Sequence, residues 1–268
     1  MKMNCLDLFS LKNRCSLVVG GAGLLGSQIS EVLAEFGSNV IVASRNEENS
    51  NSFIQRMKIK HKNLNFYFVH VDINDPKSII KMTKTVKKIT NNSLDILVNC
   101  GWSGNKNTFE SISDEDWDYD INICLNGVFK TIKNIFPLLK NGTNSNILNI
   151  ASMYGHVAPD YRLYDSKKFA NPPSYGSAKA GIIQLTKYLS SFLSPYQIRV
   201  NCISPGPFPF ESTQSENPEF IKRLSSKNPL NRIGKPYEIK GAAIVLCSNA
   251  GSYMTGQNIC VDGGWSIW

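Results

Sequence analysis

The residues best suited to chemistry in this sequence are a tyrosine and a lysine four positions apart, Tyr175 and Lys179. Apolar residues recur at helical spacing after Tyr175, and Pro172 and Pro173 precede it, which predicts a helix that starts at these prolines. Residues four apart on a helix share one face, so the phenol and the ammonium would converge. A phenol titrates at about 10 in water, and a neighbouring cation favours its ionised form. The pair therefore indicates a general acid/base, although the same spacing is also common among ordinary helix-surface residues.

A glycine-rich segment near the start of the chain is suited to binding phosphate. Gly20, Gly23 and Gly26 follow a strand predicted at residues 16–19 and open a helical pattern, after which a second strand is predicted at 40–43. A glycine turn between a strand and a helix brings backbone amides and the positive end of the helix to a pyrophosphate. This order of elements predicts a dinucleotide site.

The residues after the second strand bear on which dinucleotide binds. A carboxylate at this place commonly holds the ribose 2′-hydroxyl of NAD. The sequence has Arg45 there and no carboxylate before Glu47. Arg45 could bind a 2′-phosphate through charge-assisted hydrogen bonds. We therefore expect NADP(H) as the preferred cofactor, with NAD(H) possible, and the alternative is a solvent-facing arginine with no such role.

The rest of the chain keeps alternating between strands and helices. Further strands are predicted at residues 65–71, 94–99, 146–150, 198–203 and 258–261, with helices at 76–89, 113–139, 218–224 and 236–247 as well as the helix of Tyr175. This alternation predicts an α/β fold with a Rossmann-like, doubly wound parallel sheet flanked by helices. No linker or internal repeat divides the sequence, so we expect a single domain over residues 1–268.

Composition and charge argue against several classes of protein. No apolar run is long enough to span a membrane, and residues 1–14 lack the apolar centre of a signal peptide, so we expect a cytoplasmic protein with no membrane partner. The seven cysteines show no metal-ligand spacing. The formal charge of +8 comes from basic residues spread along the chain, which favours an anionic small-molecule ligand over nucleic acid.

Taken together, these landmarks resemble the short-chain dehydrogenase/reductase family over essentially the whole chain. The resemblance implies that Tyr175 exchanges a proton with the substrate oxygen during hydride transfer, that Lys179 holds the nicotinamide ribose, and that Ser152 hydrogen-bonds the substrate. It also implies a homotetramer or homodimer built through the long helices after the fourth and fifth strands. The cofactor-binding residues that it implies are Gly20, Gly23, Leu25, Gly26, Arg45, Asp72, Ile73, Asn99, Gly101, Tyr175, Lys179, Pro205 and Gly206.

The sequence departs from the family pattern at four places. Leu24 stands where a turn glycine is usual, Trp102 follows Gly101, and Cys124 stands at the position of the usual catalytic asparagine. An insertion at about 155–173 lengthens the segment between the catalytic serine and tyrosine. The insertion and Trp102 resemble the subgroup linked to flagellin and surface-glycan sugar biosynthesis, so the expected substrate is a sugar or nucleotide-sugar derivative. Three basic residues of the insertion could then meet a substrate phosphate, namely Arg162, Lys167 and Lys168.

Three functions follow from these observations. The first is an NADP(H)-dependent oxidoreductase that acts on a carbonyl or secondary alcohol. The second is a cofactor-binding homologue with little or no catalysis, suggested by Cys124 and Trp102. The third is a basic protein that binds nucleic acid or a charged surface. The apolar C-terminal residues Trp265–Trp268 could join a subunit interface or close the substrate cleft.

Overall fold

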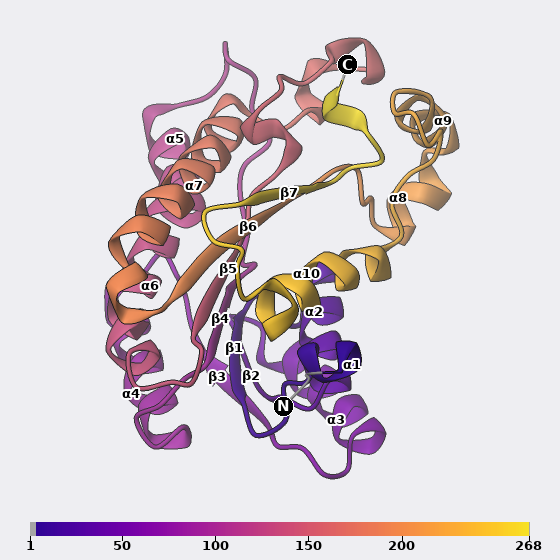
Figure 1. Ribbon diagram of the computed structural model, residues 1–268. Helices are drawn as coiled ribbons and strands as arrows, with labels where there is room; N and C mark the ends of the chain where they lie inside the picture. Colours follow the sequence, from indigo (N-terminus) through magenta and orange to yellow (C-terminus); the bar gives the residue numbers. More distant parts are fainter. Residues whose placement is uncertain (1–3, 268) are drawn as a thin grey trace.

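Seven parallel strands form one sheet in the order β3-β2-β1-β4-β5-β6-β7 in the computed structural model, which describes residues 4–267 (Figure 1). Because β1 lies between β2 and β4, the winding of the chain reverses there, and a crevice opens at the carboxyl ends of β1 and β4. The strands are Cys15–Val19 (β1), Asn39–Ser44 (β2), Phe66–His70 (β3), Ile96–Asn99 (β4), Asn146–Ile150 (β5), Arg199–Pro205 (β6) and Asn258–Val261 (β7).

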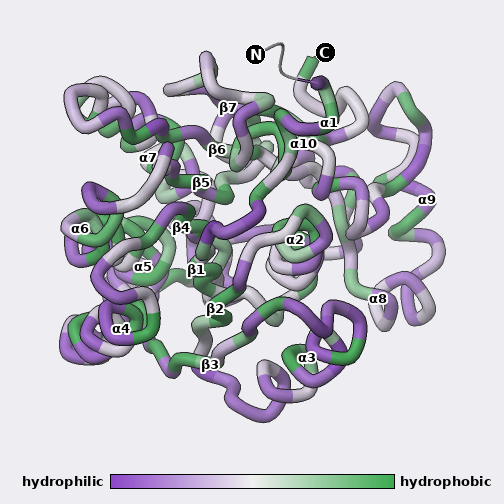
Figure 2. Tube along the Cα trace, turned by 60° about the horizontal axis from the view of Figure 1, so that its bottom comes forward, coloured by the Kyte–Doolittle hydropathy of each residue, from purple (hydrophilic) through white to green (hydrophobic). Residues whose placement is uncertain are grey.

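Helices cover both faces of this sheet, because alternate residues of the buried strands point to opposite sides. Leu17 belongs to the apolar cluster under one set of helices, and its neighbour Val18 belongs to the cluster under the other. In Figure 2 the central strands carry mainly hydrophobic colour, and the outer parts of the trace carry more hydrophilic colour. The first set comprises α4 (Pro76–Ile89), α6 (Gly127–Leu139) and α7 (Pro173–Phe192), and the second comprises α2 (Leu24–Glu35), α3 (Glu47–Lys60) and α10 (Ile239–Cys247).

The predicted fold class, a Rossmann-like doubly wound parallel sheet, is confirmed, whereas the single-domain boundaries 1–268 stay a prediction. Helix α4 and strands β5 and β7 have the predicted bounds. The helix predicted at 113–139 is divided into α5 (Asp114–Ile121), a π-helix η1 (Asn122–Asn126) and α6. Helix α3 is not predicted from the sequence, because its first half is polar and its buried residues are few.

Two segments lie beyond the carboxyl ends of the strands and complete the molecule there. The insertion forms the 3-10 turns η3 (Tyr161–Leu163) and η4 (Lys167–Phe169), and the chain after β6 forms α8 (Glu211–Glu216) and α9 (Pro218–Ser226). Helix α9 packs against η3, so the two segments support each other. Within residues 4–267, no helix combines the length and the apolar character needed to cross a bilayer.

Candidate active site

A cavity of about 800 Å³ lies at the crevice between the carboxyl ends of β1 and β4. Its walls come from the loops that follow the strands, from α7, and from α8 and α9. The structure therefore gathers side chains from along the whole chain at one place. Of the site residues expected from the sequence, the following line the cavity: Gly20, Gly23, Leu25, Gly26, Arg45, Asp72, Ile73, Gly101, Ser152, Tyr175, Lys179, Pro205 and Gly206.

Asn99 is the expected site residue that does not line the cavity. Its side chain is buried, and its Nδ2 donates to Oδ1 of Asn149 at 2.9 Å. Asn149 in turn donates to Oγ1 of Thr186 at 3.0 Å, which links β4 and β5 to α7. Asn99 therefore lies beneath the site and helps to fix the strands and the helix that carry it.

The glycine turn has a geometry that only glycine permits at two of its positions. Gly20 has a φ of 78°, in the left-handed region, and a Cβ at Gly26 would overlap the Gly20 carbonyl. Gly23 caps α2 with no side-chain hydrogen bond, so the first amides of this helix are available to a ligand. Leu24 is the first residue of α2, a position with no need for glycine, and its side chain lines the cavity.

The residues that line the cavity where β2 ends are polar and include no carboxylate. Ser44, Arg45, Asn46 and Asn49 line it there, and Arg45 is exposed. Asn46 caps the N-terminus of α3 by accepting from the amide of Asn49 at 2.9 Å. The guanidinium therefore lies at the positive end of a 14-residue helix. This arrangement can bind a dianion such as a phosphate ester.

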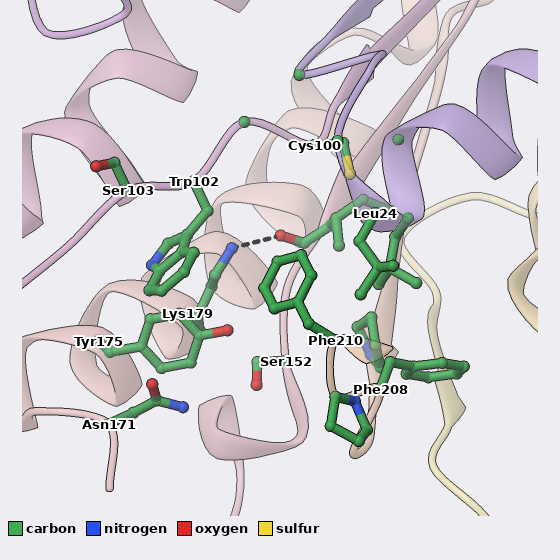
Figure 3. A pocket seen from close by; sticks show the side chains of 18 of the residues that line it. Leu24, Cys100, Trp102, Ser103, Ser152, Asn171, Tyr175, Lys179, Phe208 and Phe210 are labelled. Atoms are coloured by element: carbon green, nitrogen blue, oxygen red, sulfur yellow. Dashed lines mark hydrogen bonds between the residues drawn. The ribbon is translucent and has the colours of Figure 1, made fainter. Parts of the chain in front are cut away.

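The predicted convergence of Tyr175 and Lys179 is present on α7. The ammonium of Lys179 lies 5.6 Å from the centre of the Tyr175 ring and donates to the carbonyl of Ile150 at 2.8 Å. Figure 3 shows the Tyr175 hydroxyl directed toward Ser152, which follows β5. The Ser152 side chain is 6% exposed and accepts from the amide of Tyr154 at 3.2 Å. A hydroxyl pair and a buried cation thus meet at one wall of the cavity.

Two departures from the family pattern contact this wall. Trp102 packs edge-on against Tyr175, with ring centres 5.8 Å apart and planes at 80°. Cys124 lies in the π-helix and is buried with Ile123 and Ala178. Its sulfur is 3.9 Å from the carbonyl oxygen of Ser103, and burial raises the pKa of its thiol, so Cys124 stays neutral. π-Helices often occur at functional sites, in keeping with this position.

The structure adds lining residues that the sequence analysis did not identify. Phe208 and Phe210 belong to a Pro-Phe-Pro-Phe segment after Gly206, a pattern that could have drawn attention to them. The others come from separate loops and carry no local signal. The added side chains include six aromatic ones and the polar Lys106 and Asn171: Lys106, Tyr154, Tyr164, Phe169, Asn171, Phe208, Phe210 and Phe220.

The basic residues of the insertion lie away from the cavity. Arg162 pairs with Asp160 at 2.7 Å, and Lys167 lies 3.9 Å from Glu110. Neither these two nor Lys168 is among the lining residues. Trp265 is buried against Leu163, Leu224 and other residues behind the substrate end of the cavity, whereas Trp268 lies outside the described residues.

Comparison with known proteins gives the family. The family model described as Enoyl-(Acyl carrier protein) reductase matches residues 21–266. The chain is 30% identical to the 3-oxoacyl-(acyl-carrier-protein) reductase FabG of Thermotoga maritima, over 96% of this chain and 99% of that protein. Among solved structures, the Pseudomonas aeruginosa RhlG/NADP active-site complex is 28% identical, with coverage of 97% and 98% and a TM-score of 0.83.

A second solved structure is the short chain dehydrogenase of Leptospira borgpetersenii with bound NAD+. It is 32% identical to this chain, with coverage of 100% of this chain and 97% of that one and a TM-score of 0.83. These matches extend over the sheet, the glycine turn and the helix of Tyr175 alike. The chain therefore belongs to the short-chain dehydrogenase/reductase family of oxidoreductases.

Proposed function

We propose that this protein is an NADP(H)-dependent oxidoreductase that transfers hydride between nicotinamide and a carbonyl or secondary alcohol. The observation that carries the proposal is the presence of Tyr175, Lys179 and Ser152 in the cavity that also holds the glycine turn. The groups suited to proton exchange and those suited to phosphate binding therefore line the same cavity. The NADP bound by the Pseudomonas aeruginosa relative supports the choice of cofactor.

The residues of the cavity fit a dinucleotide along its length. The free amides at the start of α2 suit a pyrophosphate, and Arg45 suits a ribose 2′-phosphate. Asp72 accepts from the amide of Asn74 at 2.9 Å, which fixes its carboxylate where an adenine would lie. When bound, the nicotinamide supplies or accepts the hydride. NAD(H) stays a possible second cofactor, as the NAD+ of the Leptospira relative indicates.

The protein's own groups would move the proton. In the direction of reduction, the Tyr175 hydroxyl donates its proton to the substrate oxygen, while Ser152 donates a hydrogen bond to the same oxygen. The Lys179 ammonium stabilises the phenolate that forms, at 5.6 Å from the ring centre. Its hydrogen bond to Ile150 holds the ammonium in place during this exchange.

Two substrate classes have specific support. The insertion and Trp102, with their resemblance to a sugar-biosynthesis subgroup, favour a sugar or nucleotide-sugar derivative. The aromatic walls formed by Phe208, Phe210 and Phe220 also suit an apolar chain, and the FabG relative supports a 3-oxoacyl group as the second candidate.

All seven cysteines are free thiols, which supports the expected reducing cytoplasm as the compartment.

NADPH consumption tests the proposed reaction directly. The purified protein is incubated with NADPH and with ketoses, nucleotide sugars or acetoacetyl thioesters, and absorbance at the nicotinamide band is followed. We expect consumption with members of one class only. Tight NADPH binding without consumption in either class would instead support the noncatalytic alternative.

Cys124 should not be required for turnover. Its thiol is a weak donor, and its polar contact with the Ser103 carbonyl is long, at 3.9 Å. We therefore expect Cys124→Ala to change kcat by less than about threefold, since a weak hydrogen bond contributes little. Steady-state kinetics of the two proteins with the same substrate check this. A loss of tenfold or more would show that the proton path uses the thiol.

A homotetramer or homodimer is proposed from exposed aromatic side chains on α6 and α7. Phe129, Tyr188 and Phe192 are 46%, 60% and 57% exposed, and the last two rings stack with centres 6.0 Å apart. Exposed aromatic side chains such as the stacked Tyr188 and Phe192 commonly mark an interface between subunits. The double variant Tyr188→Glu/Phe192→Glu should therefore lower the mass measured by light scattering, while Tyr253→Glu, at a fully exposed position elsewhere, should leave it unchanged.

A further inference from the structure

Lys106 is a cation in the cavity that the proposed reaction does not use. It lies in the loop after β4, and its ammonium donates to Oδ1 of Asn171 at 3.1 Å. Asn171 directly precedes the prolines at the start of α7, and it lies on the same side of the cavity as Tyr175 (Figure 3). Within residues 4–267, Lys106 forms no ion pair, so none of the carboxylates described there partners its charge.

The neighbours of Lys106 hold it in this place. The Asn105 and Asn107 side chains each donate to one oxygen of Asp116, both at 2.8 Å. The amide of Asn105 also donates to Oδ1 of Asp120 at 3.1 Å, and Oδ2 of Asp120 accepts from Ser174 at 2.6 Å. The loop is thus fixed to α5 and to the start of α7 on both sides of Lys106. A site held in this way is ready for a ligand before the ligand arrives.

The surroundings of this ammonium favour an anion. Lys106 is an exposed residue of the cavity lining, so its ammonium is open to a ligand, and its partial burial lowers the pKa of the ammonium. Asp165, a charged residue of the insertion that also lines the cavity, is paired with Arg223 at 2.8 Å. Asn171 accepts from Lys106 through Oδ1, which leaves its Nδ2 as a further donor. An ammonium and an amide side by side match the two oxygens of a carboxylate or phosphate.

We propose that Lys106 and Asn171 form a subsite for an oxyanion, a carboxylate or a phosphate, carried by the same substrate whose carbonyl meets Tyr175. The inference deepens the proposed function and rests on it for the position of the carbonyl. A substrate without such a group would gain no charge-assisted hydrogen bond from the ammonium, so it would bind more weakly. The enzyme would therefore select oxo acids or phosphorylated ketones over neutral ketones of the same size.

The test compares matched ligands in the presence of NADP+, so that no hydride is available and binding is measured apart from turnover. Titration calorimetry is carried out with levulinate against methyl levulinate, and with dihydroxyacetone phosphate against dihydroxyacetone. We expect at least one anion to bind roughly 10- to 100-fold more tightly than its neutral partner, in line with hydrogen bonds to charged groups. The pair that shows the larger ratio identifies carboxylate or phosphate as the source.

Variants connect this ratio to the subsite. Lys106→Met should bring the ratio close to one, and Lys106→Arg should retain most of it. Asn171→Asp, nearly isosteric, supplies a carboxylate to Lys106 and should also remove the preference, even if Lys106→Met were to disturb the loop. Equal binding of anion and neutral ligand in the original protein, or a ratio unchanged in Lys106→Met and Asn171→Asp, would overturn the proposal.

The outcome separates this proposal from the proposed function. NADPH affinity, followed by nicotinamide fluorescence, should be the same in Lys106→Met as in the original protein, because Lys106 lies at the substrate end. If the protein reduces no carbonyl compound but still shows an anion preference that depends on Lys106, the subsite proposal is supported and the proposed reductase function is refuted. If the protein reduces carbonyl compounds but shows no anion preference, the proposed function is supported and the subsite proposal is refuted.

Discussion

Replacing Tyr175 with phenylalanine should lower kcat by roughly 1,000-fold and change the dissociation constant of NADPH by less than about twofold, within the range that general acid/base groups contribute. The change removes one oxygen. The ring stays and retains its contact with Trp102 at 5.8 Å, and the Lys179 ammonium keeps its hydrogen bond to Ile150. The proton donor is therefore lost while the walls of the cavity are preserved.

Tyr154→Phe is the matched control for this experiment. Tyr154 also lines the cavity, but its hydroxyl is hydrogen-bonded to that of Tyr164 at 2.8 Å. Burial strongly raises the pKa of Tyr154, so its hydroxyl is a poor source of protons. We expect Tyr154→Phe to retain kcat within about threefold. Single-turnover rates and NADPH fluorescence titrations of both variants give the comparison, and similar losses in both would refute the assignment of Tyr175.

The parts of the molecule that the sequence could predict are those governed by local pattern. The buried strands read as apolar runs, and α4 begins with a proline after a capping aspartate, Asp75, so its bounds could be taken from the sequence. Tyr175 and Lys179 could be paired because the period of a helix fixes their separation. The glycine turn could also be predicted from local sequence, because the steric demands that Gly20 and Gly26 satisfy arise within a few residues of each other.

Other features depend on contacts that no local pattern reveals. The π-helix at Asn122–Asn126 adds a residue to a turn inside an otherwise regular helical pattern, and the sequence predicts one long helix there. Asn99 is the last residue of β4, close to the strand ends after which the lining residues Gly101 and Asp72 lie, yet its side chain is turned toward Asn149 beneath the site. Only the packing of β4 on β5 decides this direction.

The placement of charge illustrates the same limit. The insertion carries several basic residues, and the sequence suggested that they face the substrate. In the structure Arg162 is held outside by Asp160, an acid two residues away. Lys106, in a loop with no distinctive composition, is brought to the cavity by hydrogen bonds from its neighbours to Asp116 and Asp120 on α5. Charge along the chain therefore did not indicate which basic residues line the cavity.

Reversing the charge at the end of β2 should exchange the cofactor preference. In Arg45→Glu, a carboxylate replaces the guanidinium at the N-terminus of α3, where the lining residues that follow β2 include no carboxylate. A 2′-phosphate would lose its charge-assisted hydrogen bonds and meet a like charge, so the dissociation constant of NADPH should rise roughly 100-fold. The new carboxylate can accept from a ribose 2′-hydroxyl, so NADH affinity should be unchanged or improved.

Arg56→Glu is the control that makes this result specific. Arg56 lies exposed on the same helix α3, 6.0 Å from the centre of the Phe53 ring, and is not among the lining residues. The substitution Arg56→Glu alters the formal charge by the same amount as Arg45→Glu, so any general electrostatic effect on dinucleotide binding appears equally in both variants. Titrations with NADPH and NADH should show a change of preference in Arg45→Glu alone, because only there does the altered charge meet the 2′-phosphate. Parallel losses for both cofactors would mean that Arg45 contacts a part of the dinucleotide that they share.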